Sequence, residues 1–350
     1  MTAFPSLKVR SLLITGGTGF VGRCVLDAFR RGLLEPYGVR RVIALSRHAT
    51  RLRDAAPELC GAGVELVNGD VLKLDSTFDA DVLIHAAASS DAQRYRVDPA
   101  AESRIIVEGT RRVCDVVRAA RHRPRLVYVS SGAVYGRQPA ESVALREDAP
   151  HIAETDPQKA SYTQAKREAE SLVRWLAAEA GIAARIARGF AFVGPWLPRD
   201  THFAMGNFLG NALRGEPIEV RARHTVVRSY MHADDLATWL ARLGTAPGDG
   251  CGIYNVGSAE AVSVRDLASL IAAKAGVDVA PPAAPLDTPG GSAAPVDRYV
   301  PDVRKARDDL GLSITIRLEE AIERTLRALR HDVPASTADP RSPQPRVAAR

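Results

Sequence analysis

The fold is decided by residues 11–22, which read Ser11-Leu12-Leu13-Ile14-Thr15-Gly16-Gly17-Thr18-Gly19-Phe20-Val21-Gly22. The apolar run at the start of this stretch predicts a buried strand. After the glycines, apolar residues recur at helical spacing and predict an amphipathic helix: Phe20, Val21, Val25, Leu26 and Phe29. The chain therefore begins with a predicted strand, a tight turn and a helix.

The glycines of this turn suit the binding of phosphate groups. Gly16 can adopt backbone angles that larger residues resist, Gly19 lets a diphosphate approach the main chain, and Gly22 lets the helix pack closely. The helix N-terminus then offers N–H groups and a positive dipole end to the phosphates. Such glycines also occur in ordinary α/β loops, but their position between a strand and a helix favours nucleotide binding.

The bulk composition describes a globular protein. With 350 residues, 46% hydrophobic and 25% charged, the chain can form one large domain or two closely associated ones. No apolar run reaches the ~18 residues of a membrane helix, and residues 1–10 lack the pattern of a secretory signal. The four cysteines have no metal or redox spacing. We expect a cytoplasmic protein with reduced thiols and no membrane partner.

The net charge of +6 is mild for this length, and the arginines are scattered. Aromatic residues make up only 5% of the chain, so the composition does not favour a nucleic-acid partner. An anionic small molecule accounts for the positive charge at least as well.

The end of a second predicted strand, residues 41–45, bears on the choice of cofactor. An acidic residue ~20 positions past the glycines usually binds the ribose 2′-hydroxyl and selects NAD. Here Ser46-Arg47-His48 follows the strand instead. Since an arginine pairs with a 2′-phosphate that a carboxylate would repel, we favour NADP (NADPH), with NAD as the alternative. Arg47 stacking on adenine or facing solvent is the other interpretation.

Further apolar runs at 64–67, 81–88 and 126–131 predict three more strands, and residues 98–121 predict a long helix. Alternating strands and helices of this length indicate a parallel, doubly wound α/β sheet. Asp70, at the end of the third strand, either accepts from the adenine amino group or caps the next turn. The small residues Ala86, Ala87 and Ala88 would let a cofactor lie against the end of the fourth strand.

Several motifs taken in order resemble one family over roughly residues 8–330. The motifs on which the resemblance rests are the glycine turn, Asp70-Val71, His85-Ala86-Ala87, Ser130-Ser131-Gly132-Ala133-Val134-Tyr135-Gly136, Tyr162-Thr163-Gln164-Ala165-Lys166, Arg188-Gly189-Phe190, Val193-Gly194-Pro195, Arg228-Ser229-Tyr230-Met231-His232-Ala233-Asp234-Asp235, Tyr254-Asn255-Val256-Gly257 and Tyr299-Val300-Pro301-Asp302. Together they resemble the extended short-chain dehydrogenase/reductases, and more narrowly the NAD(P)-dependent nucleotide-sugar epimerase/dehydratase group.

The resemblance implies a domain organisation and a set of cofactor contacts. A Rossmann-like NAD(P)-binding domain would span mainly residues 8–187, and an interleaved, smaller mixed α/β part that binds the nucleotide sugar would span mainly 188–330. We expect a flexible segment at 280–294 and a disordered tail at 331–350. The residues expected to bind the cofactor are Gly16, Gly19, Phe20, Val21, Gly22, Ser46, Arg47, Asp70, Val71, Ala86, Ala87, Ala88, Tyr162 and Lys166.

Three residues carry the expected chemistry. Tyr162 and Lys166 are one helical turn apart and share a face, so the ammonium would favour the phenolate and lower the tyrosine pKa. Ser131, at the end of a strand, can hydrogen-bond a substrate hydroxyl or carbonyl. Such a site passes a proton through Tyr162 while hydride moves to or from a nicotinamide. Lys166 can also hold the nicotinamide ribose.

Departures from the family pattern narrow the reaction. The 4,6-dehydratases of the family carry an Asp-Glu pair where this chain has Gly132 and Ala133, which cannot transfer a proton. We therefore do not expect a 4,6-dehydratase. Ile106 and Ala191 each replace an asparagine common in the family, which affects the placement of the substrate more than catalysis.

Substrate contacts are expected from three residues of the second half. Arg228 matches the family's diphosphate-binding arginine, a guanidinium that can bind two phosphate oxygens, and a surface salt bridge is the other interpretation. Asn207 would reach the sugar diphosphate, and Arg188 would bind substrate or form a structural ion pair. We predict no metal site, since the histidines lack metal spacing, and we place Trp175 and Trp239 in the core.

The favoured function is an NADPH-dependent reductase of a nucleotide-linked 4-keto-6-deoxysugar, and the alternative is an NAD-dependent nucleotide-sugar 4-epimerase. Both act at C4 and use the same residues. A non-catalytic dinucleotide-binding scaffold is a distant third, because such proteins have usually lost the tyrosine or the lysine. We also expect a homodimer built on the helices at 98–121 and 158–180.

Overall fold

The computed structural model describes residues 7, 9–75, 78–88, 92–199, 203–281 and 296–331. Nearly all of the expected tail and most of the flexible segment expected at 280–294 lie outside these residues. A parallel seven-stranded sheet forms the centre, in the order β10-β6-β5-β4-β1-β2-β3. Its strands are β1 Ser11–Thr15, β2 Arg41–Ser46, β3 Val64–Asn68, β4 Val82–His85, β5 Arg125–Ser131, β6 Ala184–Gly189 and β10 Cys251–Val256.

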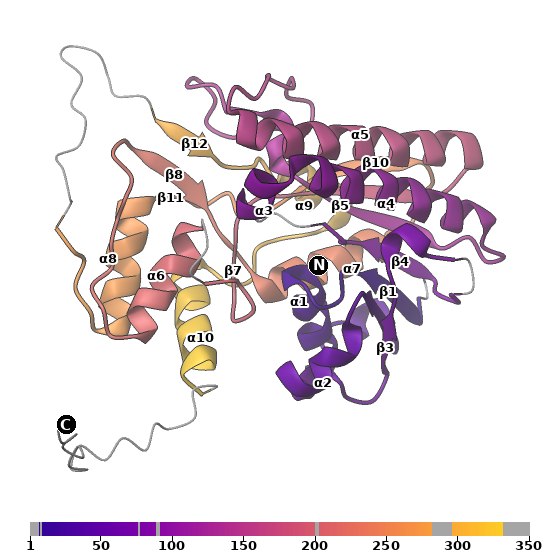
Figure 1. Ribbon diagram of the computed structural model, residues 1–350, viewed down its shortest axis with the longest axis horizontal. Coiled ribbons are helices and arrows are strands. Elements are labelled where there is room, and N and C mark those ends of the chain that lie inside the picture. Colours follow the sequence, from indigo (N-terminus) through magenta and orange to yellow (C-terminus); the bar gives the residue numbers. More distant parts are fainter. Residues whose placement is uncertain are drawn as a thin grey trace, which may run out of the picture.

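The sheet is doubly wound, as predicted. Strand β1 pairs with β2 on one side and β4 on the other, so the strand order reverses there. Helices α4 (Pro99–Ala119) and α5 (Pro157–Ala180) lie side by side along one face, with α1 (Phe20–Arg30) and α7 (Ala233–Thr245) on the other (Figure 1). Because helices cover both faces of the sheet, the strands consist of nearly continuous apolar residues. Open sheets of this kind bind ligands where the strand order reverses, beyond the carboxyl ends of the strands.

A smaller lobe stands at one end of the sheet (Figure 1). Its helices α6, α8 and α10 pack around a separate apolar core. The bounds are α6 Ala204–Leu213, α8 Val264–Ala275 and α10 Leu318–His331, with short strands β7 Phe192–Val193, β8 Val226–Ser229, β9 Met231–His232, β11 Ala261–Ser263 and β12 Asp297–Tyr299. Helix α9, Arg304–Leu310, packs instead beside β10 in the core of the large lobe. Since β10 and α7 complete the large lobe, the two halves of the sequence are interleaved in space.

The remaining elements are short and connect the large ones. They are helices α2 Leu52–Ala55 and α3 Ala92–Val97 and the 3-10 turns η1 Glu35–Tyr37, η2 Ala49–Arg51, η3 Pro57–Leu59, η4 Val71–Lys73 and η5 Gly132–Tyr135. Among the described residues, no helix combines the length and the apolar character that a bilayer crossing requires.

One of the two tryptophan predictions is wrong. Trp239 on α7 is 2% exposed and belongs to the core, but Trp175 on α5 is 53% exposed. The buried stripe of α5 follows Ala169, Val173 and Leu176. Position 175 lies about 100° around the helix from position 176, because successive residues rotate by that angle. The ring of Trp175 therefore faces outward.

Candidate active site

The glycine turn lies where β1 and β4 end together. Gly16 has φ +77°, and a Cβ there would come within 2.7 Å of the Ala86 carbonyl oxygen. The φ angle confirms the expected need for glycine at 16, and the contact adds a second reason that the sequence did not reveal. At Gly19 a Cβ would meet only the Gly16 oxygen, at 3.3 Å, so that side of the turn is open among the described residues.

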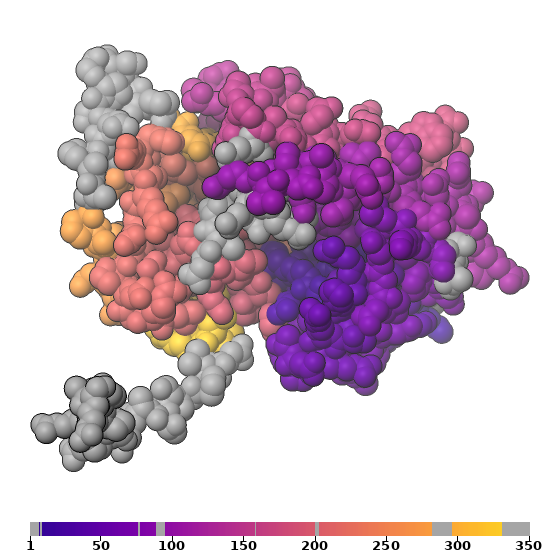
Figure 2. All heavy atoms as spheres, viewed as in Figure 1, coloured from indigo at the N-terminus to yellow at the C-terminus, as the bar shows by residue number. Residues whose placement is uncertain are grey.

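The N-terminus of α1 has no side-chain cap. Gly19 is the N-cap residue and has no side chain to bond the first N–H groups. Such a helix start attracts anions. In Figure 2 the indigo start of the chain lies recessed between the purple large lobe and the coral small lobe. An open turn, an uncapped helix start and the reversal of strand order fit a dinucleotide diphosphate.

Gly22→Ala is expected to weaken dinucleotide binding and to lower the free energy of unfolding by about 1–3 kcal/mol. The reason is that a Cβ at position 22 would overlap the backbone of Gly17. Binding is measured by fluorescence titration with NADH and stability by urea unfolding. Gly61→Ala is the control, since a Cβ there meets no described atom within 4 Å. Equal behaviour of the two variants would contradict this packing.

At the ends of β2 and β3, where the adenosine is expected, the structure favours one role for Asp70 and leaves the role of Arg47 open. Asp70 accepts from Leu72 N–H at 3.0 Å and caps the turn η4, which favours the capping role. Ser46 Oγ lies 2.7 Å from Thr18 Oγ1, so it ties the end of β2 to the glycine turn. Arg47 is exposed, and no described residue forms a hydrogen bond or ion pair with it. Its guanidinium is therefore available to a ligand.

A buried histidine fixes the end of β4. His85 Nδ1 lies 2.8 Å from Thr15 Oγ1 on β1, and Nε2 lies 3.2 Å from Thr110 Oγ1 on α4. Thr110 donates its own proton to the Ile106 carbonyl at 2.6 Å, so His85 is the donor to Thr110. Burial, and second the charge of Lys166, lower the His85 pKa to about 3. The imidazole is thus neutral and holds the small residues that follow, Ala86, Ala87 and Ala88, beside the glycine turn.

Strand β5 and helix α5 bring the three expected catalytic residues together. Ser131 is the last residue of β5, and its Oγ accepts from Ala133 N–H at 3.2 Å. The Ser131 side chain interacts with Tyr162 and lowers its pKa. The Nζ atom of Lys166 lies 5.9 Å from the centroid of the Tyr162 ring, so the lysine and the tyrosine share a face of α5.

The electrostatics of Tyr162 differ from the expectation. Burial raises the pKa of Tyr162, and the interaction with the Ser131 side chain opposes that rise. Lys166 was expected to lower this pKa. Instead, its ammonium donates to the Val129 carbonyl at 2.8 Å and lies 5.0 Å from the centroid of the Tyr128 ring. The hydroxyl of Ser131 is the group that lowers the pKa of Tyr162.

Lys166→Met is expected to change how stability depends on pH. Burial lowers the pKa of Lys166 from 10.5 to about 8. Between these values the unfolded chain binds more protons at this site than the folded protein does, so the wild type gains stability as pH rises through that window. Urea unfolding at several pH values should show that the free energy of unfolding rises more with pH in the wild type than in Lys166→Met. Lys159→Met, which removes an exposed lysine of α5, controls for net charge, and an equal pH trend in both variants would contradict the burial effect.

Arg188 is engaged in a buried ion pair. Its guanidinium donates to Glu170 Oε2 at 2.7 Å and to Oε1 at 3.0 Å, and the two side chains are 4% and 5% exposed. Arg188 also donates to the Glu147 carbonyl at 3.1 Å and lies over the Tyr135 ring. This geometry favours the structural alternative left open by the sequence. A substrate contact by Arg188 stays a prediction.

The other two expected substrate residues lie in the small lobe. Arg228 on β8 donates to Asp297 Oδ2 at 2.8 Å, and its side chain remains 25% exposed. Asn207 on α6 is half-buried, and its side-chain amide bonds no described residue. Both roles stay predictions.

One residue near Ser131 had no expected role. The hydroxyl of Tyr299, the last residue of β12, lies beside Gly132, where a Cβ would come within 2.5 Å of it. The sequence shows Tyr299 only inside the motif at 299–302, and 168 positions separate it from Ser131. No local signal could place it beside Ser131.

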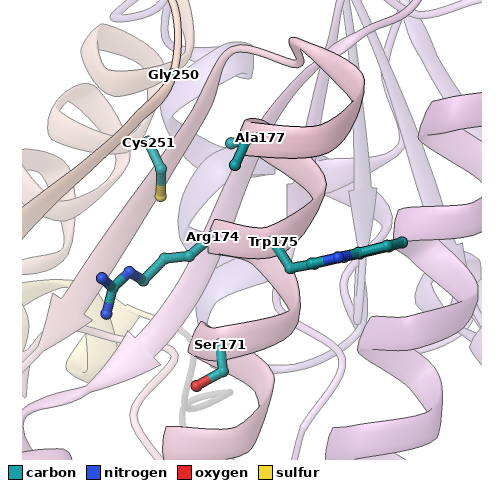
Figure 3. Close-up of a pocket in the computed structure, with 7 residues that line it drawn as sticks. Ser171, Arg174, Trp175, Ala177, Gly250 and Cys251 are labelled. Carbon is teal, nitrogen blue, oxygen red and sulfur yellow. The ribbon is translucent and has the colours of Figure 1, made fainter.

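The site is distinct from the hollow of about 510 Å³ on the outer side of α5 (Figure 3). Ser171, Arg174, Trp175 and Cys251 line that hollow, and the side chains of Arg174 and Trp175 point in opposite directions from the helix. None of its lining residues touches Ser131, Tyr162 or the glycine turn among the described contacts.

Comparison with known proteins agrees with this geometry. Residues 12–257 match the model of the NAD dependent epimerase/dehydratase family. Over 341 residues the chain is 26% identical to UDP-glucuronic acid decarboxylase 1 of Xenopus tropicalis, covering 97% of this chain and 76% of that protein.

Solved structures share the fold. UDP-glucose 4-epimerase of Thermotoga maritima, solved with UDP-glucose, matches with TM-score 0.75 and 21% identity over 92% of this chain and 99% of its own. MoeE5, solved with UDP-glucuronic acid and NAD, matches with TM-score 0.73 and 25% identity over 92% of this chain and 100% of its own. From its sequence motifs, its sheet and this match over most of the chain, the protein belongs to the NAD dependent epimerase/dehydratase family.

Proposed function

We propose that this protein transfers hydride at C4 of a nucleotide sugar, as an NAD-dependent 4-epimerase. The observation that carries the proposal is the convergence of Ser131, Tyr162 and Lys166 at the carboxyl end of β5, beside the end of β4 and the glycine turn. These residues supply a proton acceptor, a hydrogen-bond donor and a cation at one place.

The roles of the side chains follow from their contacts. Tyr162 takes the proton of the C4 hydroxyl and later returns it, and Ser131 holds the C4 oxygen by a hydrogen bond. Lys166, buried under the ring of Tyr162, supplies positive charge to that region. A bound nicotinamide would accept the C4 hydride and give it back. Return of the hydride to the opposite face of the sugar inverts C4.

The residues next to Ser131 support epimerisation over elimination. Gly132 and Ala133 have no group that can move a proton, so nothing at these positions can remove one from the carbon next to C4.

The relatives suggest the substrate class. The decarboxylases are named for UDP-glucuronic acid, and MoeE5 was solved with it. We therefore propose UDP-linked uronic acids and hexoses as the first substrates to test. The exposed part of Arg228 would meet the diphosphate.

A reductase that consumes NADPH is the second candidate. The specific observation in its favour is Arg47, an exposed guanidinium at the end of β2 without a partner among the described residues. A 2′-phosphate would pair with it.

The proposed homodimer would join α4 and α5 of two copies. Trp175 supports it as a large exposed aromatic on α5, whereas the outward side of α4 is polar and includes the exposed Arg104–Glu108 ion pair. Light scattering at micromolar concentration should give twice the chain mass, and a monomer would refute the dimer.

The experiment incubates the purified protein with UDP-glucuronic acid, UDP-glucose and a 4-keto-6-deoxysugar nucleotide, each with NAD, NADH or NADPH. Products are identified by NMR, and nicotinamide absorbance is followed. Inversion at C4 without net change in absorbance supports the epimerase. Stoichiometric loss of NADPH with the keto sugar supports the reductase. Loss of carbon dioxide from UDP-glucuronic acid, or no conversion of any nucleotide sugar, would overturn the proposal.

A further inference from the structure

A row of buried polar residues crosses the sheet one step before the active site. Ser130 on β5 is in register with Arg188 on β6, and Arg188 is in register with Asn255 on β10. These three residues, the polar row, are 4%, 3% and 0% exposed. The next row contains Ser131 and Gly189. Strands covered by helices on both faces are normally apolar at such positions, so the polar row serves a purpose other than core packing.

Glu170 joins two members of the polar row to the helix that carries the tyrosine. Its Oε1 atom accepts from the Ser130 hydroxyl at 2.6 Å, and its Oε2 atom accepts from Arg188 at 2.7 Å. Glu170 follows Lys166 by four residues and Tyr162 by eight, so the three side chains lie along one side of α5. One buried carboxylate therefore ties the ends of β5 and β6 to that side of the helix.

Lys166 makes a second attachment between the same helix and the same strand. Its ammonium donates to the Val129 carbonyl at 2.8 Å, one residue before Ser130. Successive turns of α5 are thus bonded to successive residues of β5. A slip of the helix by one residue would move these groups by about 1.5 Å, which is enough to break both bonds. The two attachments fix where Tyr162 lies relative to Ser131.

Asn255 holds the chain on the other side of Ser131. Its Oδ1 atom accepts from the Tyr135 hydroxyl at 2.7 Å, and Tyr135 ends the turn η5, which begins directly after Ser131. Its Nδ2 group donates to the Leu145 carbonyl at 2.8 Å and to the Asp302 carbonyl at 3.0 Å. The turn after Ser131 is therefore anchored to the polar row as well.

Glu147 closes the network between the two ends of the row. Its carbonyl accepts from Arg188 at 3.1 Å, and its carboxylate accepts from the Asn255 N–H at 2.9 Å. Apolar contacts have no preferred direction, whereas hydrogen bonds fix both distance and angle. A buried and mutually satisfied network therefore holds its members in a single arrangement.

We propose that Glu170 is a positioning residue of the active site, which acts through Ser130 to hold the Tyr162 side of α5 at a fixed place beside Ser131. Reacting groups must be held to within about 0.5 Å, and a misplacement of about 1 Å can cost 10²-fold in rate. The roles of Ser131 and Tyr162 rest on the proposed function. The bonds of Glu170 and of the polar row do not, because they lie within the protein.

The first test is Ser130→Ala, which removes one bond to Glu170 and leaves the ion pair with Arg188 in place. We expect kcat to fall by about tenfold while KM stays within about twofold, because the groups that act in the transition state are displaced. Thr245→Val is the matched control, since it removes a buried hydroxyl that donates to carbonyls of its own helix, α7. Its kcat should equal that of the wild type, and urea unfolding checks that both variants fold.

The second measurement needs no turnover. Protein labelled with ¹³C at the tyrosine ζ carbon is studied by NMR, and the Tyr162 signal is assigned from Tyr162→Phe. Ser130→Ala should move this signal by more than its linewidth, and Thr245→Val should not. Glu170→Asp keeps the charge beside Arg188 but shortens the side chain by one methylene, so it should move the same signal.

The outcomes separate this inference from the proposed function. An unchanged Tyr162 signal in the folded Ser130→Ala and Glu170→Asp proteins would overturn the inference, whatever the activity. A moved signal with wild-type kcat would overturn it too, because the displacement would then have no effect on the reaction. A wild type that converts no nucleotide sugar, with the signal moved in both variants, would overturn the proposed function and support the placement of Tyr162 by Glu170.

Discussion

Tyr162→Phe should reduce kcat by about 10²–10⁴-fold while the protein still folds and binds dinucleotide. The substitution removes only the hydroxyl, which is the group whose pKa Ser131 lowers. The ring keeps its edge-on contact with Tyr95, at 5.4 Å between centroids, so the packing of α3 on α5 is retained. The reduction in kcat therefore reflects the loss of proton transfer through Tyr162. The measurement is kcat and KM for the converted nucleotide sugar, with NADH titration as the binding check.

Tyr254→Phe, which removes a phenol that donates to Asp309, controls for losing a phenol elsewhere. Its activity should stay within about twofold of the wild type, because its hydroxyl bonds none of the presumed catalytic residues. Retention of wild-type activity by Tyr162→Phe would refute the acid–base role. The alternative interpretation, a non-catalytic dinucleotide-binding scaffold, would then be favoured.

Glu170→Gln should be the most destabilising single substitution considered, at about 3–5 kcal/mol of the free energy of unfolding. The carboxylate of Glu170 accepts from Arg188 and, at 2.6 Å, from the hydroxyl of Ser130. Both charged side chains are almost fully buried. The amide would leave the guanidinium in the interior without a counter-charge, and that desolvated charge is the source of the cost. Urea unfolding measures it.

Two further variants make the experiment specific. Glu108→Gln breaks an exposed pair with Arg104 on α4 and should cost no more than about 0.5 kcal/mol. The double variant Glu170→Met with Arg188→Met removes both charges and should be more stable than Glu170→Gln, because no unpaired charge remains. A double variant as unstable as the single one would show that the ion pair is not the cause.

Local features of the site were predictable from the sequence because neighbours in the chain define them. A strand followed by glycines and a helix places the turn at 16–22, and the positive φ of Gly16 confirms that need. The spacing of Tyr162 and Lys166 puts them on one face of α5. The boundaries of α4 and α5 were predicted within two residues.

Features that depend on distant contacts were not predictable. Trp175 looked like a core residue, and only the direction in which α5 packs exposes it. Lys166 was expected to tune Tyr162, but the Val129 carbonyl of the neighbouring strand binds the ammonium. Arg188 could have faced the substrate or a carboxylate, and only the fold brings Glu170 to it.

By itself, then, the sequence determined the doubly wound sheet, the glycine turn and the face of α5 that carries Tyr162, since strand and helix periodicity and turn chemistry are local. The tertiary structure decided which groups surround these residues: the burial that raises the pKa of Tyr162, the partner of Arg188, and the placement of the Tyr299 hydroxyl beside Gly132. The physical reason is that burial and hydrogen bonding depend on distance in space, and residues 132 and 299 become neighbours only when the small lobe docks on the sheet.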